Sequence, residues 1–313
     1  MARFPFPIPV GWFHVAFDAD IEPASIHPMN LFGRELALWR AEDGELCLQD
    51  RYCPHLGGNF AVGGQVVGQT LECPFHKWRF ATDGQVAEIP YAKKLNRSAC
   101  VRTYPLQVKH GIVMGWYHPQ GALPSFDLPE APELNGGEFT PIHSTRHEIK
   151  TCMQEMGENT ADSAHFHSVH KHPQAAAYDA FVCEGPVMAM DSQQVFPSSR
   201  GPVPGTLTSR THGFGWSIVR YRTLVDVCLL TSSAPIDEET VVQHFHVSYR
   251  NPEDDARIHR IGQAFDAEVN RQFREDIAIW ESKIYQPDPQ LCDGDGPVGK
   301  YRNWAKQFYF EAV

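Results

Sequence analysis

The chain has 313 residues, of which 42% are hydrophobic and 21% charged, so it is long enough for two globular domains and too apolar for a disordered protein. Its net charge of −11 argues against binding to a nucleic-acid backbone, which requires a basic surface. No apolar run reaches the roughly 18 residues of a membrane span, and the proline-rich N-terminus lacks a signal peptide, so we expect a cytoplasmic protein.

Residues 10–120 carry the pattern of a small all-β domain. Short β-rich runs recur at residues 36–39, 46–48 and 111–116, and Gly, Asp and Pro residues separate them. This pattern is typical of a sandwich or barrel, and we assign residues 1–120 to the first domain.

Two short segments of this domain each combine one thiol with one imidazole, at Cys53 and His55 and again at Cys73 and His76. Zinc accepts two cysteines and two histidines, but zinc fingers usually pair like residues within one segment. The mixed segments favour a [2Fe–2S] cluster, in which one iron takes both thiolates and the other both imidazoles. Neutral imidazole ligands would raise the reduction potential of such a cluster.

The spacing Cys-x-His, 17 residues, Cys-x-x-His, followed by Trp78, resembles the Rieske cluster motif. The resemblance implies that the four ligands hold a Rieske [2Fe–2S] cluster. Lys77 stands where the family commonly has glycine.

Residues 118–142 are rich in Pro, Gly and acidic residues and predict a linker, so we assign residues 121–313 to a second domain. The pattern there predicts an antiparallel sheet packed by one long helix, a helix-grip-like arrangement, and the fold class is therefore α+β. The predicted elements are a strand at 144–150, a helix at 154–170, strands at 206–213, 216–232 and 240–250, and a helix at about 252–283.

The predicted helix at 154–170 carries several candidate metal ligands, namely Asp162, His165, His167 and His170. Two histidines and one carboxylate on one side of an Fe(II) ion leave positions open for O₂ and substrate. On a regular helix His167 and His170 share a face, whereas His165 and His170 point about 140° apart. Helical geometry alone therefore favours the pair His167 and His170.

Asp276 lies on the apolar stripe of the long helix, between Phe273 and Trp280. An unpaired carboxylate facing a core is costly unless it binds a cation or a partner. Asp276 is thus the best candidate for the third ligand, with a buried salt bridge as the alternative.

The spacing Asp-x-x-His-x-x-x-x-His resembles the mononuclear iron motif of Rieske non-haem iron oxygenases. That resemblance selects His165 and His170 with Asp276 as the Fe(II) ligands, and it requires the helix to bend or end there. It implies that Asp162 carries electrons between the two metal sites and that Asn159 lies near the iron. We interpret His167 as a pocket or supporting residue, and His172 as solvated or structural.

The C-terminal stretch from residue 275 through 295–298 to 304–309 resembles the oxygenase subunit of 3-ketosteroid 9α-hydroxylase. The resemblance implies O₂-dependent monooxygenation of a polycyclic, steroid-like substrate. It also implies a homotrimer and a separate NAD(P)H-dependent reductase with flavin and an iron–sulfur cluster. Oxidative demethylation, desaturation or aromatic dihydroxylation by the same iron are alternatives. A Rieske electron carrier and a zinc-stabilised binding module are alternatives of other classes.

Overall fold

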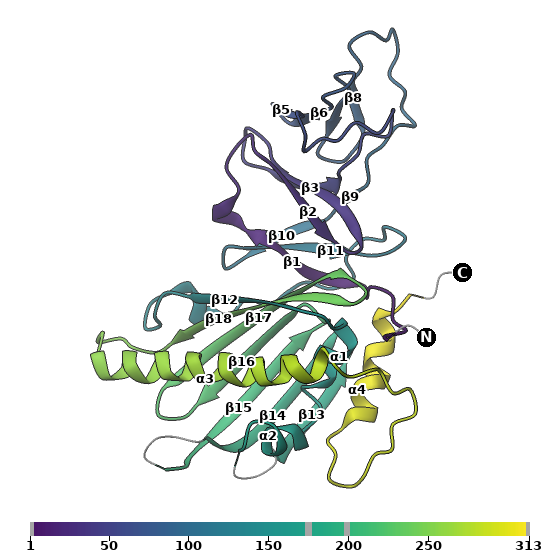
Figure 1. The fold of residues 1–313 in the computed structure, drawn as a ribbon. Helices are drawn as coiled ribbons and strands as arrows, with labels where there is room; N and C mark the ends of the chain where they lie inside the picture. Colours follow the sequence, from purple (N-terminus) through teal and green to yellow (C-terminus); the bar gives the residue numbers. More distant parts are fainter. Residues whose placement is uncertain (1–2, 173–176, 197–200, 311–313) are drawn as a thin grey trace. The chain divides into compact units, whose positions relative to one another are not determined.

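The computed structural model describes residues 3–172, 177–196 and 201–310, and the chain divides into two compact units (Figure 1). The N-terminal unit comprises His14–Ser125, and the C-terminal unit comprises Phe126 onward together with the segment up to Phe13. The predicted boundary after residue 120 lies close to this division. The segment before His14, which we had assigned to the first domain, groups with the second unit.

The N-terminal unit is built mainly from three small sheets, as the β-rich pattern predicted. One sheet holds β1 (Gly11–Phe17), of which the part from His14 onward belongs to this unit, together with β11 (Ile112–Tyr117) and β10 (Leu106–Lys109). The second holds β2 (Ile26–Leu31), β3 (Arg34–Arg40), β4 (Leu46–Asp50) and β9 (Thr103–Tyr104). The third holds β5 (Gln65–Val67), β6 (Thr70–Glu72), β7 (Arg79–Ala81) and β8 (Val86–Glu88). Cys53 and Cys73 belong to the apolar core of this unit, so the two candidate cluster loops are anchored in it.

The C-terminal unit contains one antiparallel sheet of seven strands. Their spatial order is β12 (His143–Ile149), β18 (Thr240–Tyr249), β17 (Asp226–Asp237), β16 (Trp216–Arg222), β15 (Val203–His212), β14 (Val187–Phe196) and β13 (Ala177–Glu184). The predicted single strand at 216–232 is wrong, because the chain turns between Arg222 and Asp226. The turn carries neither Gly nor Pro, and Leu224 at its tip is exposed, so the sequence offered no signal.

The helix α3 (Ala256–Trp280) lies across one face of this sheet, which confirms the predicted α+β fold (Figure 1). Its predicted stripe packs on β17 and β18 through Ile258, Ile261, Phe265, Val269 and Phe273. The helix begins a few residues later than predicted, because the Asp255 side chain accepts the Arg257 backbone N–H and caps it. Other helical elements are α4 (Val298–Ala305) and the 3₁₀ turns Asp18–Asp20, Pro132–Asn135 and Lys306–Phe308.

The helix predicted at 154–170 is broken into α1 (Met153–Glu158) and α2 (Ala164–Ser168). The break follows from Asp162, whose Oδ1 accepts the backbone N–H groups of Ala164 and His165 at 3.1 and 3.3 Å. A side chain that satisfies these donors starts a new helix rather than continuing the previous one. The candidate residues at 162, 165 and 170 therefore lie in or beside a short helix that begins separately from α1.

Candidate metal centres

The two cluster loops of the N-terminal unit have the same local structure. The Gly57 N–H donates to the Cys53 carbonyl at 2.9 Å, and the Lys77 N–H donates to the Cys73 carbonyl at 3.1 Å. Both closing residues have positive φ angles, +74° at Gly57 and +60° at Lys77. Each cysteine thus begins an equivalent turn, and each turn presents one histidine beside one thiol.

Lys77 therefore stands at a position that favours glycine, since a left-handed backbone costs a residue with Cβ about 1 kcal/mol or more. Its ammonium group forms an ion pair with Glu72 at 3.1 Å, and Glu72 also binds Arg79 at 2.9 Å. Glu72 is buried, so this contact ties the lysine side chain to the base of the loop. The departure from glycine keeps the turn and adds a side-chain contact.

The four cluster candidates lie together in the N-terminal unit. Cys53 and Cys73 are buried, and burial together with the neighbouring Cys73 raises the pKa of Cys53 to about 12. The rings of His55 and His76 lie 4.7 Å apart, and His55 stacks on Trp78 at 4.4 Å.

The His76 Nδ1 atom is buried and has no hydrogen-bond partner among the described residues. Such an atom destabilises a fold unless something binds it. This nitrogen, together with the two buried thiols, fits a cluster bound by two cysteines and two histidines.

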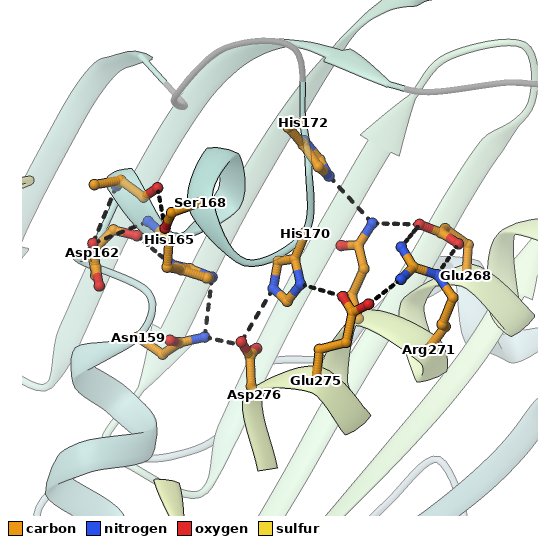
Figure 2. Close-up of polar contacts among 12 residues, drawn as sticks. Asn159, Asp162, His165, Ser168, His170, His172, Glu268, Arg271, Glu275 and Asp276 are labelled. Atoms are coloured by element: carbon orange, nitrogen blue, oxygen red, sulfur yellow. Dashed lines mark hydrogen bonds and ion pairs between the residues drawn. The ribbon is translucent and has the colours of Figure 1, made fainter. Parts of the chain in front are cut away.

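A second group of candidates meets in the C-terminal unit. His165, His170 and Asp276 are all buried, and each offers one ligand atom within 4.8 Å of the others (Figure 2). The two imidazole rings lie 5.1 Å apart at an angle of 83°, and His170 Nε2 is 3.2 Å from Asp276 Oδ1. Asp276 reaches the group from α3, and both histidines come from the α2 segment.

The turn that ends α2 explains why His165 and His170 meet although they are five residues apart. The His170 N–H points to the His165 carbonyl at 3.4 Å, an i to i+5 contact of the π-helical kind. One wide turn places the two side chains on the same side, whereas a regular α-helix would not. Lys171, with a φ of +60°, then ends the turn.

The ring nitrogens of His165 have defined neighbours. Its Nδ1 donates to the Asp162 backbone carbonyl at 2.5 Å, which leaves Nε2 facing the group. Asn159 Nδ2 lies 3.3 Å from this Nε2 and donates to Asp276 Oδ2 at 3.2 Å. Asn159 thus connects one histidine to the carboxylate.

The charges of the group suit a divalent cation. Burial lowers the pKa of His165 more than the nearby carboxylates raise it, which favours the neutral imidazole that binds metals. Burial also lowers the pKa of His170, but hydrogen bonds to Asp276 and Glu275 outweigh it and the net shift is upward. Within the described residues no lysine or arginine forms an ion pair with Asp276. A buried carboxylate of this kind fits a metal ion.

The two other histidines of the segment lie outside the group. His167 is exposed and does not line the cavity described below, so the pocket interpretation is wrong. Its Nδ1 instead lies 2.7 Å from the His172 carbonyl, which supports the segment from outside. His172 is buried rather than solvated, and its Nε2 lies 3.2 Å from Gln272 Nε2.

Comparison with known proteins identifies both units. Residues 11–105 match the Rieske [2Fe–2S] domain, and residues 115–309 match the 3-ketosteroid 9α-hydroxylase C-terminal domain. The chain belongs to the Rieske oxygenase family. This membership confirms the predicted enzyme class and its two cofactors, a Rieske [2Fe–2S] cluster and a mononuclear non-haem iron.

Individual relatives agree with this membership. The oxygenase component of 3-ketosteroid-9-alpha-monooxygenase from Mycolicibacterium smegmatis is 30% identical, over 97% of this chain and 83% of the relative. Cholesterol 7-desaturase from Xenopus laevis is 30% identical, over 96% of this chain and 72% of the relative. The crystal structure of dicamba monooxygenase bound to dicamba superposes with a TM-score of 0.74 at 16% identity, over 95% of this chain and 96% of that structure. This likeness shows the fold.

In this Rieske oxygenase the His165, His170 and Asp276 group opens into a cavity of about 220 Å³ inside the C-terminal unit. Most of its lining is apolar, with side chains from the sheet, α1 and α3, among them Met156, Met188, Met190, Leu207, Val219, Leu229, Phe245, Phe273 and Trp280. A cavity beside a metal-binding group is the usual arrangement for a site that acts on a bound small molecule.

Sequence reasoning missed one residue of the site. Glu275 Oε2 lies 3.1 Å from His170 Nδ1, on the side of the ring opposite Asp276 (Figure 2). A weak signal existed, because Glu268, Arg271 and Glu275 have the spacing of one helix face and can form successive ion pairs.

Among the described residues no helix combines the length and apolar character that a membrane crossing needs.

Proposed function

We propose that this chain is the oxygenase component of a steroid monooxygenase, which uses O₂ and electrons from a separate NAD(P)H-dependent reductase to hydroxylate a C–H bond of a polycyclic substrate. The observation that carries the proposal is the buried group of His165, His170 and Asp276 at the wall of an apolar cavity. The relatives named as oxygenase components of 3-ketosteroid-9-alpha-monooxygenase support both the substrate class and the need for a reductase.

The mononuclear iron would be held by His165, His170 and Asp276. When bound, an iron with two histidines and one carboxylate supplies O₂ activation at positions that the protein leaves open. Asn159 holds the Asp276 carboxylate and lies beside His165, so it fixes the distance between two of the ligands. The mostly apolar walls would exclude water from around a bound substrate.

The cluster would be held by Cys53 and Cys73 on one iron and by His55 and His76 on the other. Its role is to receive electrons from the reductase and pass them to the mononuclear iron, which the histidine-raised potential of a Rieske centre favours. The buried Nδ1 of His76, which has no hydrogen-bond partner within the described part of the chain, supports this assignment.

Electrons would pass between subunits of a homotrimer, from His76 of one subunit through Asp162 of its neighbour to His165. Asp162 supports this route, because its backbone carbonyl accepts the His165 Nδ1–H and its half-buried carboxylate caps the same turn. The mass of the assembly in solution tests the trimer. A cytoplasmic location stays a prediction from the sequence.

The cavity supports a substrate that is mostly apolar and carries few oxygen atoms. Three hydroxyl-bearing residues, Thr211, Ser217 and Thr231, face one another on adjacent strands of the cavity floor. The Thr211 hydroxyl donates to Ser217 Oγ at 2.9 Å, and Ser209 Oγ, which also lines the cavity, lies 3.2 Å from the same atom, so this row forms a polar patch in a mostly apolar lining. A row of hydroxyl groups suits an isolated keto or hydroxyl group, as a steroid presents.

Desaturation is the second candidate, because several relatives are named cholesterol 7-desaturase. The same iron site would serve both reactions, so the position of the bound carbon decides between them.

Product analysis tests the proposal. The purified protein, with a surrogate reductase and NADH, is incubated with a panel of 3-ketosteroids and cholesterol under isotopically labelled O₂. Hydroxylation is expected to give one labelled oxygen in the product, whereas desaturation gives an unlabelled product that lacks two hydrogens. A protein that contains about three irons per chain yet consumes no O₂ with any steroid would contradict the steroid assignment. A protein with about two irons would indicate an electron carrier.

A further inference from the structure

Two consecutive residues of α3 contact the two ring nitrogens of His170. Its Nε2 lies 3.2 Å from Asp276 Oδ1, and its Nδ1 lies 3.1 Å from Glu275 Oε2 (Figure 2). Since Nε2 faces the group with His165, the proton of the neutral ring resides on Nδ1 and is donated to Glu275. This assignment rests on the proposed function, in which Nε2 of His170 is an iron ligand.

Glu275 is itself held by residues one and two turns earlier on α3. Arg271 donates to Glu275 Oε1, and its guanidinium also binds both oxygens of Glu268 at 2.8 and 2.6 Å. Glu268 in turn accepts Gln272 Nε2 at 2.8 Å, and this Nε2 lies 3.2 Å from His172 Nε2. We call Glu268, Arg271, Gln272 and Glu275 the α3 clamp. The clamp contacts the 170–172 segment at both of its ends.

The exposure of the clamp argues against a mainly stabilising role. Glu268 and Glu275 are about one third exposed and Arg271 slightly more. Ion pairs this exposed contribute little to the free energy of unfolding. His170, by contrast, is buried, and a carboxylate on the outer nitrogen of a metal-binding histidine fixes the ring and makes the inner nitrogen a stronger ligand.

Glu275 has no other evident role at the site. It does not line the cavity, so it does not contact the substrate there. The three-residue ligand group does not include it, because its carboxylate lies on the outer side of the His170 ring. His165 has a weaker support, since its Nδ1 donates to a neutral backbone carbonyl. The two histidines are therefore held by different kinds of acceptor.

We propose that Glu275 is a positioning residue of the iron site, which fixes the ring of His170 and strengthens its bond to the metal, and that Arg271 holds Glu275 in place for this task. The helix α3 then has two roles at the iron site. It supplies the ligand Asp276, and through Glu275 it holds the ring of the ligand His170 in its iron-binding orientation.

The test is Fe(II) titration into protein from which the mononuclear iron has been removed with the cluster left intact. Glu275→Ala is expected to weaken Fe(II) binding about 10- to 100-fold, the usual effect of losing such a support. Glu275→Gln keeps an acceptor for the Nδ1–H and is expected to lose clearly less. Arg271→Ala should fall between the wild type and Glu275→Ala. The matched control is Arg274→Ala, since Arg274 is exposed, adjacent in sequence and absent from the hydrogen bonds and ion pairs of the clamp.

A second readout is the EPR spectrum of the nitric oxide adduct of the bound iron. A loosened His170 should broaden this spectrum in Glu275→Ala and leave it unchanged in Arg274→Ala, with the cluster absorbance equal in all variants. Wild-type Fe(II) affinity and an unchanged spectrum in Glu275→Ala would overturn the inference. His170→Ala separates this failure from that of the proposed function, because retention of the mononuclear iron in that variant would refute the iron site itself.

Discussion

Replacement of Gly58 by alanine should abolish the cluster through one contact. An added Cβ would lie 2.7 Å from Cys73 Sγ and 3.3 Å from the Cβ of Phe75. Non-bonded carbon and sulfur atoms of this kind rest at about 3.5–4 Å, so the sulfur would have to move by about 1 Å. Metal–ligand bonds tolerate deviations of only about 0.2 Å, and Cys73 could not then serve as a ligand in its present place. Iron should fall from about three to about one per chain, with loss of the visible cluster absorbance.

Gly57→Ala is the matched control in the same loop. Gly57 has a φ of +74°, so alanine is strained there by about 1 kcal/mol, but nothing lies within 4 Å of the added methyl. This variant should keep about three irons per chain. The two proteins differ only in where one methyl group points, and iron analysis with visible absorption spectra compares them. A Gly58→Ala protein with full cluster absorbance would refute the contact argument. Equal loss of the cluster in both variants would show that backbone conformation, rather than the approach to Cys73, requires glycine.

Three further predictions concern the C-terminal unit. Asp276→Ala should reduce iron from about three to about two per chain and leave the cluster spectrum intact; wild-type iron content and turnover would exclude Asp276 as a ligand. Asp162→Asn keeps the side-chain oxygen that accepts the first N–H groups of α2 and removes the negative charge. The iron content should therefore stay the same, while electron transfer from the reduced cluster to the mononuclear iron should slow in single-turnover measurements. An unchanged rate would exclude the proposed route. Burial lowers the pKa of His244 to about 4, below that of the unfolded residue. As the pH falls, His244 therefore becomes protonated in the unfolded chain before it does so in the folded protein. The free energy of unfolding should consequently decrease by up to about 3 kcal/mol between about pH 6.5 and pH 4. Denaturant unfolding of His244→Asn should show a smaller decrease, and an equal decrease would contradict the assignment.

The sequence was sufficient where the determining residues are neighbours in the chain. Each half of the cluster motif lies within four residues, so a short turn brings one thiol and one imidazole together without help from distant segments. The long helix was predictable for a similar reason, because its apolar stripe repeats with the helical period and packs on the sheet as expected. Asp276 could be singled out because it is a carboxylate on that stripe, and the structure shows it to be buried.

The sequence was insufficient where hydrogen bonds altered the regular period. Helical geometry favoured His167 as the partner of His170, but the i to i+5 contact at the end of α2 brings His165 to His170 instead. The resemblance to a known motif selected this pair without giving the physical reason. The hairpin between β16 and β17 escaped notice because no turn residue marks it.

By itself, then, the sequence determined the two-unit α+β fold, the short cluster motif and the presence of an acid on a core-facing helix, since each depends on the period or spacing of nearby residues. Only the tertiary structure decided which histidines meet Asp276, that Glu275 supports one of them, and that Gly58 leaves room for a sulfur atom. Those relations join segments as far apart as residues 165 and 276, and a local pattern does not determine which distant side chains come within a few ångströms of each other.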